Sequence, residues 1–115
     1  MENWKVVISD EEIDEALERS KNQQPRPNAV TAVYDARFDL IILVLDTGAR
    51  LTIPREQLQD LQQAHPAQLS EIEIHSGVNI AWPQLDVDLY LPYLLEGRYG
   101  STEWMQSLQR KMTAA

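Results

Sequence analysis

Two carboxylates placed two residues apart, Asp86 and Asp88, are the side chains in this sequence with the clearest chemical potential. Such a pair could bind a divalent cation or take part in acid–base chemistry. A cation site needs further ligands, however, and this stretch lacks the glycine and the distant glutamate of a calcium-binding loop. The structural alternative is that either aspartate caps the helix after it, or that an Asx-turn fixes the corner behind Trp82-Pro83. The sequence favours this structural role and predicts no metal ligand.

Other reaction centres find no support in the residue pattern. The chain has no cysteine, which excludes thiol catalysis and cysteine zinc sites. Its four glycines are scattered, so the pattern of a phosphate-binding loop or a dinucleotide fingerprint is missing. His65 and His75 lack the spacing of a helical zinc site, and no serine stands in a Gly-x-Ser-x-Gly setting. We therefore predict that the chain is not an enzyme, with no catalytic residue and no cofactor.

The net charge of −8, from 18 acidic and 10 basic residues, limits the choice of partner. Nucleic-acid binding relies on lysine and arginine to displace counterions, so nucleic acid is disfavoured. The charge either solvates the surface, which we favour, or forms an acidic face for a basic partner. The longest apolar run, Leu40 to Leu45, is far shorter than the roughly 20 residues of a membrane helix. With no signal-peptide layout at the N-terminus, we expect a cytoplasmic location.

The body of the chain is predicted to open with an antiparallel three-stranded meander. Its strands are expected at residues 29–34, 38–45 and 50–53. The second strand has apolar residues on both faces, which is typical of a central strand covered on both sides. Asp35-Ala-Arg37 suits a tight hairpin, and Asp46-Thr-Gly48 suits the next turn.

Helices and a second β-hairpin are predicted after the meander. Proline at the end of the third strand favours a helix over residues 55–64. Alternating apolar and polar residues then predict paired strands at 71–75 and 78–82. The apolar segment 89–95 follows the two aspartates, and Pro92 stands near the start of the helix expected there.

A helix is also expected near the N-terminus. Residues 4–8 are predicted to be extended, and Ser9 with Glu12 forms the sequence pattern of a capping box for a helix over residues 10–22. Residues 21–28 are expected to form a loop, because two prolines exclude both a helix and a central strand.

A second terminal helix is predicted over residues 102–112, and it raises the question of what covers its apolar stripe. Such a stripe packs on the body of its own chain, on a second copy or on a partner, and the sequence leaves this open. Aromatic and methionine side chains often anchor interfaces. Together with the two carboxylates they give the candidate binding residues: Trp82, Asp86, Asp88, Trp104, Met105 and Leu108. For Trp82, ordinary core packing is favoured.

The run Ile80-Ala-Trp-Pro-Gln-Leu-Asp-Val-Asp88, followed by Leu94-Leu95, resembles a bacterial family known as domain of unknown function 2442. The turn Asp46-Thr-Gly48-Ala-Arg50 and the pair Ile53-Pro54 are also similar to that family. The resemblance covers roughly residues 30–95, and the terminal helices lie outside it. It implies a small α+β domain without established catalytic residues, and an antitoxin-like or regulatory role.

These observations together predict one α+β domain over residues 1–115, built from an antiparallel meander and a second β-hairpin with packed helices. The expected function is a non-enzymatic protein-interaction module, antitoxin-like or regulatory. Its partner would be a basic, toxin-like protein, and a homodimer is also considered. Two alternatives stay open: a small metal-binding or hydrolytic protein that uses Asp86 and Asp88, and a transcriptional regulator.

Overall fold

The computed structural model describes residues 9–20 and 27–114. The extended segment predicted at residues 4–8 lies outside the described residues, as do residues 21–26 of the predicted loop. In the described part, the chain forms two three-stranded antiparallel sheets with helices around them. The predicted α+β class is confirmed.

The first sheet is the predicted meander. It consists of β1 (Ala29–Asp35), β2 (Leu40–Leu45) and β3 (Arg50–Pro54), with β2 in the centre. The second strand begins at Leu40 and not at residue 38, because the connection to β1 is a four-residue turn over residues 36–39. Phe38 lies in that turn with 54% of its surface exposed. The prediction of a tight turn at residues 35–37 was therefore wrong.

The second sheet contains β4 (Glu73–His75), β5 (Asn79–Trp82) and β6 (Val87–Tyr90), with β5 in the centre. The predicted hairpin is thus extended by a third strand. The helix expected near Pro92 is confirmed, and residues 89–90 precede it as the end of β6. They pair with β5, and α3 (Leu91–Leu95) begins directly afterwards.

The third strand forms because the chain reverses sharply after the Trp-Pro corner. Pro83 opens a short 3-10 turn, η3 (Pro83–Leu85), and Asp86 follows in the left-handed conformation with φ 55° and ψ 44°. A left-handed residue turns the backbone tightly, and aspartate tolerates this better than most residues. As a result Val87 lies opposite Trp82.

The helix predicted over residues 55–64 was wrong. The segment instead forms two 3-10 turns, η1 (Arg55–Gln57) and η2 (Gln59–Leu61), separated by the extended residue Leu58. Leu58 points into the core with 1% exposure, and the side-chain amide of Gln62 donates to two carbonyls of this segment at 2.9 and 2.8 Å. Apolar residues three apart fit a 3-10 turn as well as an α-helix, so their spacing could not separate the two.

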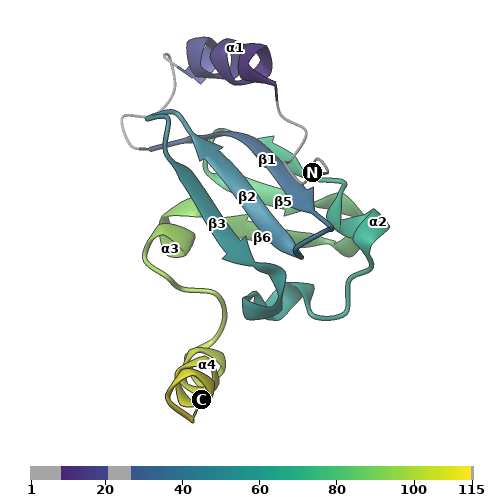
Figure 1. Ribbon diagram of the computed structural model, residues 1–115, viewed down its shortest axis with the longest axis vertical. Coiled ribbons are helices and arrows are strands. Elements are labelled where there is room, and N and C mark those ends of the chain that lie inside the picture. The colour runs from purple at the N-terminus through teal and green to yellow at the C-terminus, as the bar shows by residue number, and fades with distance from the viewer. Residues whose placement is uncertain (1–8, 21–26, 115) are drawn as a thin grey trace, which may run out of the picture.

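The core lies between the two sheets, whose inner faces are apolar. Figure 1 shows the first sheet in front of the second, with α2 (Pro66–Leu69) and α3 at their margins. Burial of this apolar surface is the main driving force for such a fold. The largest fully buried residues of the cluster are Ile41, Leu43, Ile53, Leu58, Leu61, Leu69, Ile80, Trp82 and Leu91.

The terminal helices lie at opposite ends of the molecule (Figure 1). α1 (Asp10–Ser20) begins with the predicted capping box: Ser9 N–H donates to Glu12 Oε1, and Glu12 N–H donates to Ser9 Oγ, each at 3.1 Å. Residues 21 and 22 of that predicted helix lie outside the described residues. α4 (Thr102–Ala114) confirms the C-terminal helix and continues two residues further. Across the described ranges, every helix is too short or too polar to cross a membrane.

Candidate functional site

Trp82 is a structural anchor. Its side chain is fully buried, and its indole N–H donates a hydrogen bond to the carbonyl oxygen of Leu69 at 3.1 Å. Buried indoles usually find such a partner because an unpaired N–H away from water is costly. The bond joins β5 to the end of α2. Trp82 therefore presents no surface to a partner in the folded chain.

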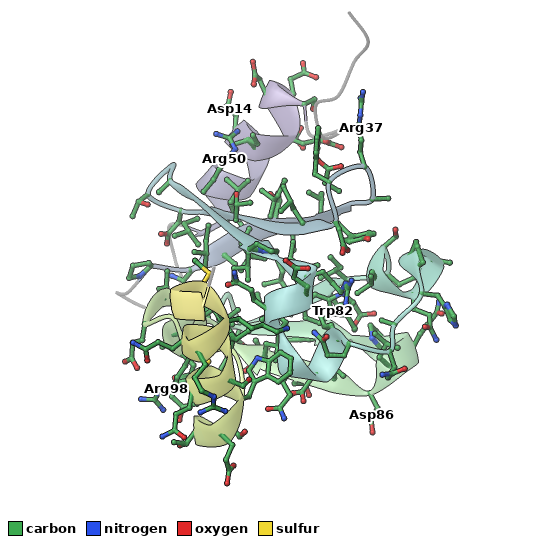
Figure 2. The ribbon with its side chains drawn as sticks, turned by 60° about the horizontal axis from the view of Figure 1, so that its bottom comes forward. Asp14, Arg37, Arg50, Trp82, Asp86 and Arg98 are labelled. Carbon is green, nitrogen blue, oxygen red and sulfur yellow. The ribbon has the colours of Figure 1, made fainter. Side chains whose placement is uncertain are left out.

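The two predicted carboxylates occupy different settings. Asp86 stands in the reversal before β6 and points away from the body (Figure 2). Asp88 lies on β6 opposite Ala81 and is exposed. No side-chain cap stabilises the start of α3, where Tyr90 is the cap residue, so the predicted helix-capping role was wrong. Among the described residues, no group of three His, Cys, Asp or Glu could hold a metal ion.

The three candidates on α4 face the body of the protein. The indole N–H of Trp104 donates to the carbonyl oxygen of Gln57 at 2.8 Å. The sulfur of Met105 accepts a hydrogen bond from the backbone N–H of Tyr99 at 3.2 Å. Leu108 is half-buried one turn further on. α4 is thus attached through its first turns, and its apolar stripe continues to Met112, which is 72% exposed.

Two hydrogen bonds of Gln59 fix the start of α4, and no sequence pattern predicted them. Gln59 donates its backbone N–H to the carbonyl of Tyr99 at 3.0 Å, and its side-chain oxygen accepts the N–H of Ser101 at 2.8 Å. Between these bonds lies Gly100, where a Cβ atom would stand 2.5 Å from Trp104 Cδ1 and 2.6 Å from Gln59 Oε1. Only glycine fits there, because neighbouring atoms already occupy the space of a side chain. In the sequence, Gly100 itself was the feature that could have indicated this close contact.

An open groove of about 780 Å³ runs along α4. One wall is the α4 stripe, and the other comes from η1 and from the connector over residues 98–100. The groove walls combine apolar side chains and amides with three charged residues, Glu56, Arg98 and Lys111. The groove lining includes Glu56, Gln57, Arg98, Met105, Leu108 and Met112.

A second, smaller pocket of about 350 Å³ adjoins the groove at the same connector. We call it the acidic–tyrosine pocket. Its lining includes Asp60 from η2, Asp88 and Tyr90 from β6, Tyr93 from α3, and Arg98. The rings of Tyr90 and Tyr93 meet edge-to-face, with centroids 5.2 Å apart and planes at 84°. Of the predicted pair of carboxylates, Asp88 lines this pocket and Asp86 lines neither this pocket nor the groove.

Arg98 stands between the groove and the pocket and lines both. Its guanidinium carbon lies 4.6 Å from the centroid of the Tyr93 ring, and its Nη2 pairs with Glu96 Oε1 at 3.0 Å. Figure 2 shows Arg98 beside α4 and well away from Asp86. The stacking shows that the tyrosine face accepts a guanidinium, in line with cation–π attraction.

A charged cluster missed by the sequence reasoning lies at the β1–β2 turn. Asp39 accepts a hydrogen bond from the Tyr34 hydroxyl at 2.7 Å and a two-pronged contact from Arg55 at 3.1 and 2.7 Å. The hydrogen bond from Arg55 is the main reason that the pKa of Asp39 is lowered. Burial, followed by the bond to Asp39, raises the pKa of Tyr34 to about 12. The cluster ties the turn to the end of β3 and lines neither cavity.

The chain forms a small α+β fold with two adjoining cavities at its surface. The family model described as "Protein of unknown function (DUF2442)" matches residues 29–100. The chain belongs to this family, which confirms the resemblance seen in the sequence. The match continues past residue 95 and so includes the connector between the two cavities.

Two solved bacterial structures are similar to this chain. A crystal structure of a protein of unknown function from Rhodospirillum rubrum is 36% identical, covers 70% of this chain and 98% of its own, and has a TM-score of 0.66. The solution structure of an uncharacterized protein from Chromobacterium violaceum is 29% identical, covers 90% of this chain and 95% of its own, and has a TM-score of 0.62. No curated protein matches the chain.

Proposed function

We propose that the chain is a non-enzymatic protein-interaction module that binds its partner along the α4 groove. The observation that carries this proposal is the incomplete cover of the α4 stripe. Met105 and Leu108 are half-buried, Met112 is 72% exposed, and all three line the 780 Å³ groove. An apolar stripe left partly in water gains free energy when a second surface covers it.

The proposed partner is a basic protein, as an antitoxin-like role would require. Supporting this, the chain carries a net charge of −8. Opposite charges accelerate encounter and disfavour wrong partners more than they raise affinity. A cytoplasmic location belongs to the same proposal, and cell fractionation tests it.

The experiment compares partner capture by the wild-type chain with two lysine substitutions on α4. Met112→Lys places a charge in the groove, whereas Glu103→Lys places one on α4 outside the groove lining. Captured proteins are identified by mass spectrometry, and binding is then measured with the purified partner. We expect Met112→Lys to abolish binding and Glu103→Lys to retain it. Equal binding by all three chains, or no protein captured by wild type, would overturn the proposal.

Oligomeric state is measured in parallel by sedimentation, because a second copy of the chain is the competing occupant of the groove. If the wild-type chain is a dimer and Met112→Lys converts it to a monomer, the occupant of the groove is a second copy of the chain and not a different protein.

A further inference from the structure

We propose that the acidic–tyrosine pocket receives a lysine or arginine side chain of the partner polypeptide. This inference rests on the proposed interaction function and adds the chemistry of recognition. It concerns the pocket lined by Asp60, Asp88, Tyr90 and Tyr93, which adjoins the α4 groove at the connector.

The first argument is the charge balance of the pocket. Asp60 and Asp88 are exposed, and no salt bridge within the described ranges involves either. The one basic residue in the lining, Arg98, already pairs with Glu96 at 3.0 Å. The pocket therefore offers carboxylate acceptors whose charge the chain itself does not neutralise at short range. A cationic group is the complementary ligand.

The second argument is the aromatic wall, which is independent of the carboxylates. Tyr90 and Tyr93 are 39% and 48% exposed, although tyrosine rings of this size normally bury more of their surface. Their edge-to-face contact at 5.2 Å holds both rings at the pocket. Ring faces attract ammonium and guanidinium groups. The chain's own Arg98 guanidinium already lies 4.6 Å from the Tyr93 centroid, whereas within the described residues no cation lies over the Tyr90 ring.

The third argument is position. The pocket and the α4 groove share residues 98–100, so a segment that fills the groove passes directly beside the pocket. This distinguishes the pocket from the acids of α1, which lie on the exposed surface of a helix at the opposite end of the molecule. The two cavities together fit a partner segment in which apolar side chains are followed by a basic one.

The test uses the full chain, labelled with ¹⁵N, and three synthetic peptides of equal length that alternate leucine with lysine, arginine or glutamate. We expect the two basic peptides to shift the amide signals of β6 and α3, and the leucine–glutamate peptide to leave them in place. The double variant Asp60→Asn/Asp88→Asn should weaken binding of the basic peptides about tenfold, which corresponds to about 1.4 kcal/mol.

A matched control removes the same charge elsewhere. Asp10→Asn/Asp14→Asn neutralises two exposed carboxylates of α1 and should change affinity about twofold or less, because charges further away than a Debye length are screened. Equal losses in both double variants would show attraction to the whole acidic surface and overturn the inference. So would basic peptides that shift only signals outside β6 and α3.

The two proposals fail in distinguishable ways. If partner capture is lost in Met112→Lys but unchanged in Asp60→Asn/Asp88→Asn, the interaction function stands and the cation pocket is refuted. If neither variant changes capture, both are refuted. Loss of capture in both variants supports both.

Discussion

The indole N–H of Trp104 donates a 2.8 Å hydrogen bond to the backbone carbonyl of Gln57, 47 residues earlier in the chain. This bond joins the C-terminal helix to a 3-10 turn that follows the first sheet. It lies beside the α4 groove, where Gln57 forms part of the lining. The position of α4, and with it the shape of the groove, thus depends on a few polar contacts more than on burial of its apolar stripe.

Substitution of Trp104 by phenylalanine should loosen α4 without unfolding the sheets. The ring is retained but the N–H donor is lost, which leaves the Gln57 carbonyl without this partner and costs about 1 kcal/mol. Hydrogen exchange resolved by residue measures the effect, and faster exchange is expected in residues 102–114 only. The amides of β2 and β5 serve as the internal reference. Unchanged exchange along α4 would contradict the role of this bond.

Gly100→Ala should displace α4 more strongly. The added methyl group would meet Trp104 Cδ1 at 2.5 Å and Gln59 Oε1 at 2.6 Å. The contacts of Gln59 and Trp104 at the start of α4 must therefore shift, which is expected to cost about 1–3 kcal/mol of stability. Limited proteolysis followed by mass spectrometry should show earlier cleavage between the second sheet and α4. Gly48→Ala is the control, because its methyl group meets nothing within 4 Å and its φ of 91° confines the strain to the β2–β3 turn. The same α4 cleavage in both variants would refute the steric argument.

Trp82 should be among the most sensitive positions for stability. Trp82→Ala removes a fully buried side chain and is expected to lower the free energy of unfolding by about 3–5 kcal/mol. Trp82→Phe keeps most of the ring volume but loses the hydrogen bond to the Leu69 carbonyl, and this loss is expected to lower the free energy of unfolding by about 1–3 kcal/mol. Denaturant unfolding with a probe of secondary structure measures both changes. A Trp82→Phe variant as stable as wild type would show that the hydrogen bond contributes little.

The sequence predicted the elements whose determinants are local. The capping box of Ser9 and Glu12 specifies the start of α1 within one turn. The continuous apolar run specifies the central strand β2, and the alternation of apolar residues specifies β5. β6 was missed because its pairing depends on the left-handed Asp86, which tertiary contacts select. The signal was present nonetheless: Val87 and Leu89 point inward and alternate with Asp88 and Tyr90.

The residues that line the two cavities were harder to predict than the fold. Trp104, Met105 and Leu108 were chosen from helical spacing, and the structure places them at the interior side of α4. The sequence could not show that Tyr93 and Asp60 line the same pocket as Asp88, since α3, η2 and β6 meet only in the folded chain. Residues that converge from separate elements leave no spacing pattern in the sequence.

The raised pKa of the Tyr34 hydroxyl predicts that the folded chain loses stability at alkaline pH. Its pKa is raised from 10.0 to about 12 in the folded chain, first by burial and then by the bond to Asp39. Because the unfolded chain releases this proton first, the contribution to stability is complete below pH 10.0 and is lost as the pH rises towards about 12. The Tyr34→Phe variant has no hydroxyl to titrate, so its free energy of unfolding lacks this alkaline loss. The difference in free energy of unfolding between wild type and variant should therefore narrow between pH 10.0 and about pH 12. Denaturant unfolding at a series of pH values measures it, with Tyr93→Phe as a control that removes a hydroxyl outside the cluster. Parallel curves for wild type and Tyr34→Phe would mean that the hydroxyl does not titrate as the Asp39 contact requires.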